Sequence, residues 1–319
     1  MTDTHTKAKR SKVWKVIVLI LAIMLAGGGW WVWKEGRPWF YGVQAYIYGF
    51  PLVVMDLTRQ VSTAVPTPGE VTAPVNQFSV MTHYPDASFR LIPRTGLDTQ
   101  FALSWADLKD EPLVLSVPDT AGRYYVIALF DMWSNVFESI GSRTTGTAAG
   151  NFLLAGPGWE GTTPPDIQKV YRAPTRHVWV NGQMQSNGPQ EYDVVNALQK
   201  QYRLTPLSAW GTDYASPAEV PVDPATDKAP PLEQVRQMDA KAFFGRLARL
   251  MYDNPPFAED APMLEKLQVL GIEPGKEFDF SKLDASTARA LERAMGAYEL
   301  LAMGVQKLET EQGLSLIHI

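Results

Sequence analysis

The sequence contains no cysteine among its 319 residues. It therefore excludes a disulfide framework, a thiolate nucleophile, thiol redox chemistry and every zinc or iron–sulfur site that needs cysteine ligands. The absence fits an oxidising compartment, but many cytosolic proteins also lack cysteine, so it discriminates weakly. Histidine is scarce too. Away from the two termini only His83 and His177 remain, and neither stands in a ligand spacing such as HExxH, so no metal site is predicted.

The bulk of the chain is also poor in positive charge. Residues 1–37 carry seven basic and two acidic side chains, whereas the remainder carries 22 basic and 32 acidic ones. A region with this acidic excess repels phosphate backbones, so nucleic acid is not an expected partner. Hydrophobic residues at 45% and charged residues at 20% are typical of a folded globular protein. The length allows about two domains in addition to an anchor.

One long run without charge, residues 16–33 (VIVLILAIMLAGGGWWVW), stands near the N-terminus. As a helix it would extend about 27 Å, which is enough to cross a bilayer. Residues 1–15 form a basic stub, so the positive-inside rule places the N-terminus in the cytoplasm. Tryptophans at the outer end predict an interfacial belt: Trp30, Trp31, Trp33 and Trp39.

We therefore predict a single-pass transmembrane anchor in the cytoplasmic (inner) membrane, with a periplasmic or extracellular globular region. Two alternatives compete with the anchor. The first is a cleaved signal peptide, because Ala22 to Gly27 offers small residues with the spacing of a cleavage site. The second is a fully buried helix of a soluble protein, which the one-sided basic flank disfavours.

Beyond the anchor, the pattern predicts an α+β multidomain protein with an antiparallel β-sandwich-like domain followed by a helical region. An apolar, aromatic helix at residues 41–57 should kink or end before Pro51. Short runs bounded by Pro, Gly, Asp or Asn then predict strands: Phe89–Ile92, Gln100–Trp105, Leu113–Val117, Tyr124–Phe130, Phe152–Ala155 and His177–Val180. Strand and helix do not alternate, so a doubly wound nucleotide-binding fold is disfavoured.

The second half of the chain has a helical pattern. An amphipathic helix is predicted at residues 191–202, and the Pro-rich segment 216–231 is predicted to be a linker. Further helices are expected at 232–252, 262–270 and 286–308. The predicted domains are therefore a β-rich region, 41–215, and a helical region, 232–313. The last residues, 314–319 (LSLIHI), resemble translated adapter sequence, so we expect a non-native tail and a missing native C-terminus.

Several short motifs contain residues that could carry chemistry. Residues 141–146 have the glycine spacing of a phosphate loop, but Thr147 and Ala148 stand where Lys and Ser/Thr are required. This loop is either a flexible small-residue loop or a place where Arg143, Thr144 and Thr145 contact an anionic or hydroxylated ligand. No serine lies in GxSxG, which disfavours a serine hydrolase.

Acidic residues gather at predicted strand ends and turns, and two of them at a separation of about 5 to 9 Å would suit glycoside hydrolysis: Asp98, Asp107, Asp119, Asp131 and Glu138. The chain spacing does not establish that distance. Residues 130–135 (FDMWSN) end a strand with an acid, an indole and an amide, which suits contact with a sugar or another polar small molecule. The alternative is a buried tryptophan in a turn that Asp131 and Asn135 stabilise.

Long stretches of the sequence resemble a bacterial family called domain of unknown function 1254. They are AYIYGFPLVVMD, the run from LDTQFALSWADLKDEPLVLSVPDTAGRYY through GNFLLAGPGWEG, and LQKQYRLTPLSAW. The resemblance covers about residues 41–215. It implies a following β-rich domain, domain of unknown function 1214, which this chain lacks, and two all-β parts bridged by helices. Residues 95–97 (TGL) precede Asp98 and Thr99 where the family commonly has an Asn or Pro-Asn.

Our leading hypothesis is that the outer region binds or processes a polar small molecule or envelope saccharide. The residues expected to line the site are Tyr46, Tyr48, Asp98, Thr99, Asp131, Trp133, Arg143 and Thr144. No catalytic residue and no cofactor is assigned. The alternative is a non-catalytic envelope module that docks a protein partner through an apolar and aromatic surface.

Overall fold

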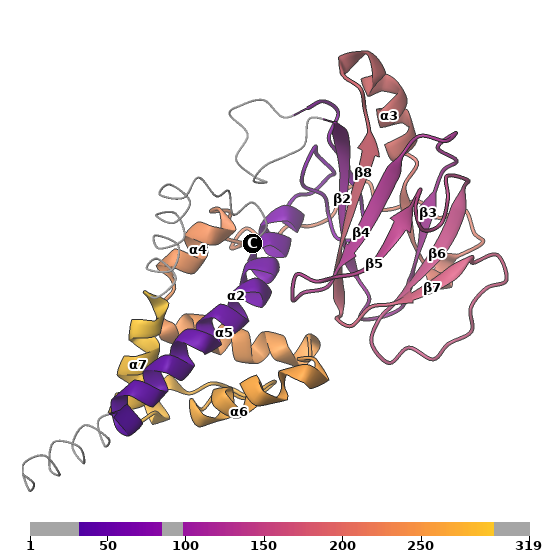
Figure 1. The fold of residues 1–319 in the computed structure, drawn as a ribbon. Helices are drawn as coiled ribbons and strands as arrows, with labels where there is room; N and C mark the ends of the chain where they lie inside the picture. The colour runs from indigo at the N-terminus through magenta and orange to yellow at the C-terminus, as the bar shows by residue number, and fades with distance from the viewer. Residues whose placement is uncertain (1–31, 85–97, 297–319) are drawn as a thin grey trace, which may run out of the picture. The chain divides into compact units, whose positions relative to one another are not determined.

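The structure is a computed structural model that describes residues 32–84 and 98–296 (Figure 1). The chain forms two compact units. The helical unit comprises Met1–Gly49, Asp239–Gly245 and Phe257–Ile319, and the sandwich unit comprises Phe50–Met238 and Arg246–Pro256. The division falls within two helices, so each unit is assembled from segments that are distant in sequence.

Two sheets form the body of the sandwich unit (Figure 1). The five-stranded sheet has the order β1-β2-β8-β4-β5, and the four-stranded sheet has the order β7-β6-β3-β9. All neighbours pair antiparallel except β6 and β7, which are parallel. The strands are β1 Ser79–Val80, β2 Thr99–Asp107, β3 Leu113–Val117, β4 Tyr125–Phe130, β5 Val136–Gly141, β6 Gly150–Ala155, β7 Lys169–Arg172, β8 His177–Gln185 and β9 Arg203–Pro206.

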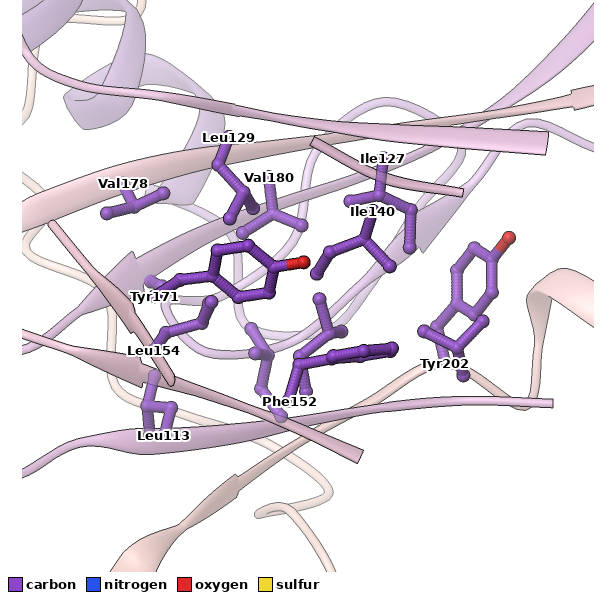
Figure 2. Close-up of a cluster of buried hydrophobic side chains, with 14 of the residues drawn as sticks. Leu113, Ile127, Leu129, Ile140, Phe152, Leu154, Tyr171, Val178, Val180 and Tyr202 are labelled. Atoms are coloured by element: carbon purple, nitrogen blue, oxygen red, sulfur yellow. The ribbon is translucent and has the colours of Figure 1, made fainter. Parts of the chain in front are cut away.

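The core of the sandwich lies between these sheets, because alternate residues of each strand point inward. In β4, Tyr125, Ile127 and Leu129 are buried, while their neighbours are half-buried. Figure 2 shows Ile127 and Leu129 facing Phe152 and Leu154 of the other sheet. Each fully buried side chain of this size contributes about 1.5–3 kcal/mol relative to its exposed state, so the sandwich has a substantial core.

Helices make up the rest of the described chain. They are α2 Arg37–Thr63, α3 Tyr192–Gln199, α4 Pro231–Gln237, α5 Ala240–Asp253, α6 Ala261–Val269 and α7 Ala285–Met295, with a π-helical turn at Val32–Gly36 before α2. Short 3-10 turns lie at Pro189–Glu191, Leu207–Ala209, Ala258–Asp260 and Phe280–Lys282. Rings from Tyr46, Phe243, Phe244 and Phe278 pack in the helical unit, with centroids 4.6 to 6.4 Å apart.

The predicted strands from Gln100 onward are confirmed as β2, β3, β4, β6 and β8. The helix expected at 41–57 does not end at Pro51 but continues to Thr63. Buried residues on both sides of the proline, Tyr46, Leu52 and Val53 among them, stabilise the helix against the missing hydrogen bond. The predicted helix at 232–252 is two helices, α4 and α5, which end and begin around Met238 and Asp239.

Several predictions fall outside the described residues: most of the anchor at 16–33, the strand at 89–92 and the tail at 314–319. In the described part of the chain, no helix combines the length and the hydrophobicity needed to cross a bilayer.

Candidate functional site

The five-stranded sheet has two ends, and the strand register sorts the predicted site residues between them. Thr99, at the start of β2, lies opposite Gln185, at the end of β8. Asp107, at the end of β2, lies opposite His177, at the start of β8. We call these the Gln185 end and the His177 end. Because β4 begins opposite Met184 and ends opposite Trp179, residues on either side of β4 lie at opposite ends.

Four of the predicted residues lie at the Gln185 end. Asp98 is exposed, and its carbonyl oxygen accepts the Ser186 amide at 2.9 Å. Thr99 follows it on β2. Arg143 and Thr144 come directly after β5, whose last residue pairs with Val126 near the start of β4. Both are exposed, and the Arg143 guanidinium carbon lies 5.5 Å from the ring centroid of Tyr124.

A groove of about 750 Å³ lies at this same end, between the turn that precedes β4 and helix α3. We call it the α3 groove. Its lining consists of Thr120, Ala121, Gly122, Arg123, Gln185, Asn187, Asp193, Val194, Ala197 and Leu198. Polar groups from the turn and from the end of β8 thus face an apolar strip along α3. Val194 on that strip is 55% exposed.

An ion pair holds the two walls of the α3 groove together. Arg123 Nη1 lies 2.6 Å from Glu191 Oε2 and donates to the Gln185 carbonyl oxygen at 2.9 Å. The Glu191 carboxylate also accepts the backbone and side-chain N–H groups of Asn187, at 3.1 and 3.0 Å. The bonds from Asn187 and from Arg123 lower the pKa of Glu191 to about 2. The guanidinium is therefore held in one orientation at the groove.

Asp193 is the free carboxylate of this groove. It is exposed in the first turn of α3, and in the described part of the chain it accepts no hydrogen bond and pairs with no cation. An exposed carboxylate without a partner keeps its acceptor oxygens open to a ligand.

Asp131 and Trp133 lie at the other end of the sheet, after β4. Asp131 is fully buried, and its oxygens accept the Trp133 amide at 2.8 Å and both the amide and side-chain nitrogens of Asn135 at 2.9 and 3.1 Å. Burial raises the pKa of Asp131, and the bonds from Asn135 and Trp133 offset only part of that effect. These bonds keep Asp131 within its own turn and remote from Arg143.

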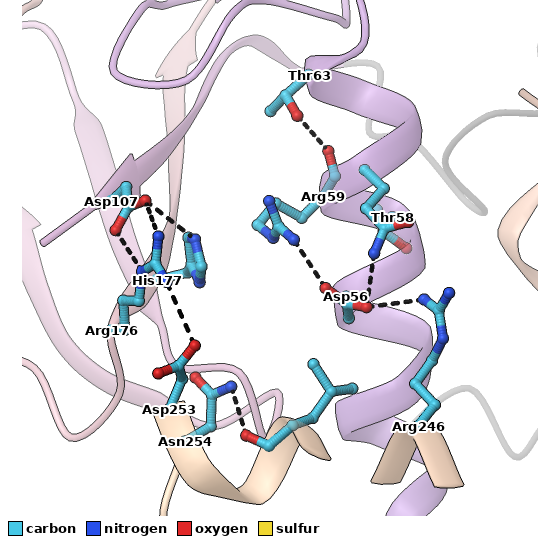
Figure 3. A network of polar contacts seen from close by, with 12 residues as sticks. Asp56, Thr58, Arg59, Thr63, Asp107, Arg176, His177, Arg246, Asp253 and Asn254 are labelled. Atoms are coloured by element: carbon cyan, nitrogen blue, oxygen red, sulfur yellow. Dashed lines mark hydrogen bonds and ion pairs between the residues drawn. The ribbon is translucent and has the colours of Figure 1, made fainter. Parts of the chain in front are cut away.

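Ion pairs dominate the His177 end (Figure 3). Arg176 binds Asp107 through Nε and Nη2, at 2.7 and 2.6 Å, and its Nη1 lies 3.3 Å from Asp253 at the end of α5. His177 Nε2 lies 3.4 Å from the same Asp107 carboxylate. Burial alone would raise the pKa of Asp107, but hydrogen bonds from Arg176 and His177 hold it well below its usual range. The carboxylate oxygens of Asp107 are therefore already bound by Arg176 and His177.

Tyr46 and Tyr48 belong to the helical unit, whereas the other six predicted residues belong to the sandwich unit. Tyr46 is 3% exposed and packs on Phe243 with ring centroids 4.6 Å apart. The Tyr48 hydroxyl donates to Asp260 at 2.9 Å, and burial together with that carboxylate raises its pKa. Both side chains therefore make contacts within the helical unit, and their predicted role in ligand binding stays a prediction.

The sequence reasoning missed Arg123, Glu191 and Asp193. Arg123 belongs to no sequence motif, and Glu191 and Asp193 look like ordinary polar residues of an amphipathic helix. Only the pairing of β4 with β8 brings them together. Among the described residues, no three His, Asp or Glu side chains are placed to hold a metal ion.

Comparison with known proteins gives one family match. Residues 75–206 match the family model described as "Protein of unknown function (DUF1254)". This part of the chain resembles the DUF1254 family. The DUF1254 region contains all the strands of both described sheets, helix α3 and the whole lining of the α3 groove.

Solved structures support the fold. The VPA0106 protein of Vibrio parahaemolyticus is 24% identical and aligns over 84% of this chain with a TM-score of 0.60. The present chain spans 60% of the length of that protein. An uncharacterised protein of Burkholderia cenocepacia is 16% identical over 35% of this chain and 31% of its own, with a TM-score of 0.24, too low to inform the fold. No curated protein matches the chain.

Proposed function

We propose that the DUF1254 region is a binding domain for a polar small molecule of the saccharide class, held in the α3 groove. The observation that carries the proposal is the groove itself. Its volume of about 750 Å³ falls within the range of small-molecule sites, roughly 300–1,000 Å³. It is more open to solvent than enclosed, which suits one or a few sugar units of a larger chain.

The lining supports a hydroxylated ligand rather than a purely apolar one. Gln185 and Asn187 carry amides, Asp193 carries an unpaired carboxylate, and Arg123 presents a guanidinium fixed by Glu191. Sugar hydroxyls both donate and accept hydrogen bonds, so they match this mixture. The strip formed by Val194, Ala197 and Leu198 offers an apolar surface to the C–H face of a sugar ring.

Arg143 and Tyr124 extend the same end of the sheet. The Tyr124 carbonyl accepts the Gln185 amide at 2.9 Å, so this residue adjoins the groove, and Arg143 lies over its ring. An aromatic ring and a guanidinium are common contacts of sugars. Together with Asp98, Thr99 and Thr144 they would recognise units beyond the groove.

We further propose that the protein acts at the cell envelope, with the DUF1254 region outside the cytoplasmic membrane. The support is the uncharged run at residues 16–33 with its basic cytoplasmic flank. A saccharide ligand would then be a component of the envelope itself. Protease protection in spheroplasts, where residues after 33 should be cut from outside, measures this orientation.

The binding proposal is tested with the full chain purified in detergent. A panel of mono- and oligosaccharides is screened by thermal shift, and hits are titrated by calorimetry. Asp193→Asn should weaken a hit by roughly tenfold, because a hydrogen bond to a charged group contributes about 1.5–3 kcal/mol. Asp110→Asn, an exposed aspartate after β2 with no partner among the described residues, is the matched control. Absence of any hit, or equal affinity in both variants, contradicts the proposal.

A second candidate function, a module that docks another protein, rests on a different feature. Three apolar side chains recur at seven-residue spacing on α2 and the turn before it: Trp33 is 64% exposed, Phe40 53% and Ile47 48%. Such a stripe is typical of a contact surface. Cross-linking from photo-reactive groups placed at position 40, compared with the same group at the exposed control position 241, distinguishes a docked protein from none.

A further inference from the structure

A buried carboxylate between two arginines occupies the sandwich unit, apart from the α3 groove. Asp56 of α2 is 4% exposed. Its Oδ1 accepts Arg59 Nη2 at 2.8 Å, and its Oδ2 accepts Gln60 Nε2 and Arg246 Nη1, both at 2.8 Å. Arg59 and Gln60 stand three and four residues after Asp56, so they share its helix face, while Arg246 comes from α5 (Figure 3).

The charges of this group do not balance. Two guanidinium groups meet one carboxylate, and among the described residues no second carboxylate is bonded to Arg59 or Arg246. The other ion-pair group drawn in Figure 3 does not compensate, because its carboxylates bind Arg176. A net charge of one positive unit therefore stays on this partly buried group, and a bound anion would neutralise it.

The two arginines also have donors to spare. A guanidinium carries five N–H donors, and each of these two donates one hydrogen bond to Asp56, at 2.8 Å. Arg59 Nε is buried and finds no acceptor among the described residues, which is a costly state for a donor. The side chains of Arg59 and Arg246 are 20% and 23% exposed, so neither is fully buried.

From these observations we infer that Arg59 and Arg246 form a binding site for a singly charged oxyanion, the carboxylate group of a small molecule. One negative charge neutralises the group, and the planar carboxylate matches the guanidinium fork. Asp56 has two roles in this site. It orients both arginines, and its own charge repels an anion with a second negative charge, so sulfate and inorganic phosphate dianions bind more weakly than a carboxylate.

The site is independent of the proposed saccharide function. Asp56, Arg59 and Arg246 all lie outside residues 75–206, and none of them lines the α3 groove. Loss of saccharide binding would leave the anion site untouched, and the reverse holds as well.

The test titrates the full chain in detergent with isotope-labelled acetate, observed by NMR, at constant ionic strength maintained with chloride. Dimethyl phosphate serves as a second monoanion of different shape and sulfate as a dianion. Wild type should bind acetate saturably and sulfate at least fivefold more weakly. Arg246→Gln should weaken acetate at least tenfold, while Arg249→Gln, an exposed arginine on the same helix, should leave it unchanged.

Asp56→Asn separates a ligand site from a purely structural ion cluster. Removing the competing carboxylate raises the net charge of the group, so acetate should bind several-fold more tightly and sulfate should lose its disadvantage. A structural cluster predicts a destabilised protein without gain of anion affinity. If wild type shows no saturable acetate signal, if Arg249→Gln weakens it as much as Arg246→Gln, or if dimethyl phosphate binds better than acetate, the carboxylate site is refuted.

Discussion

The ion pair between Asp107 and Arg176 provides the sharpest test of the sandwich unit. Asp107 ends β2, and its carboxylate accepts two hydrogen bonds from Arg176 at 2.7 and 2.6 Å, with His177 3.4 Å away. The substitution Asp107→Asn removes the charge and one acceptor while keeping the shape. It also keeps an oxygen for the Lys109 amide, which now lies 3.1 Å from Oδ1.

The expected loss of stability follows from the solvent exposure of the Asp107–Arg176 ion pair. A fully buried pair costs about 3–5 kcal/mol when one partner is removed, and a fully exposed pair about 0–1 kcal/mol. The side chains of Asp107 and Arg176 are 22% and 25% exposed, and Arg176 keeps a contact with Asp253. We therefore expect a loss of about 2–3 kcal/mol. For a unit of this size that corresponds to a melting temperature lower by about 4–12 °C.

The pH dependence gives an independent signature. The pKa of Asp107 is lower in the folded protein than in the unfolded chain. The contribution of its charge to the free energy of unfolding is therefore fully present above the unfolded pKa of about 3.9, and it is lost as the pH falls through the folded pKa. The part of the stability difference between wild type and Asp107→Asn that comes from the Asp107 charge should shrink below about pH 4. Scanning calorimetry at a series of pH values measures it.

Asp110→Asn is the matched control for this prediction, since Asp110 is exposed in the turn that follows the same strand. It should melt within about 1 °C of wild type, as surface substitutions usually do. An Asp107→Asn variant as stable as the control would refute the ion-pair reasoning. So would a difference that stays the same down to pH 3.

Two further predictions concern the core of the sandwich. The Tyr202 hydroxyl is buried without a hydrogen-bond partner among the described residues. The substitution Tyr202→Phe should therefore be neutral or stabilise the protein by up to about 1 kcal/mol in denaturant titrations. A loss greater than 1 kcal/mol for Tyr202→Phe would reveal a hidden partner such as a buried water. Gly141→Ala would place a Cβ 2.4 Å from the Tyr125 carbonyl oxygen, so it should cost about 2 kcal/mol more than Gly122→Ala, where the added Cβ meets nothing. Equal losses of stability in the two variants would mean that the backbone around Gly141 shifts to make room for the added Cβ.

The sequence predicted the interior strands of the sandwich and missed its edges. Each of β2, β3, β4, β6 and β8 has neighbours on both sides, and each was predicted from its apolar run. The edge strands, β1, β5, β7 and β9, were not predicted. Edge strands are short and partly exposed, and their pairing partner defines them more than their own residues do. Val136, the first residue of β5, is 54% exposed and gives no burial signal.

The ionic groups were beyond prediction for a related reason. Asp56 and Arg246 are 190 residues apart in the chain, and Asp107 and Arg176 are 69 apart. Hydrophobic periodicity shows which face of an element is buried, but it does not show which buried charge meets which partner. The bond of Tyr48 to Asp260, 212 residues away, was beyond prediction for the same reason.

The edge strand β5, which was not predicted, also explains why the predicted site residues lie at two different ends of the sheet. Asp131 precedes β5 and Arg143 follows it, and a strand of this length carries the chain about 17 Å along the sheet. Without β5, the segment from 131 to 149 looks like one long loop, in which Asp131, Trp133, Arg143 and Thr144 share a neighbourhood. Because β5 runs antiparallel to β4, the turn before β5 and the turn after it lie at opposite ends of the sheet. Arg143 and Thr144 then lie at the same end of the sheet as Asp98, Thr99 and the α3 groove, and Asp131 lies at the His177 end with the ion pairs.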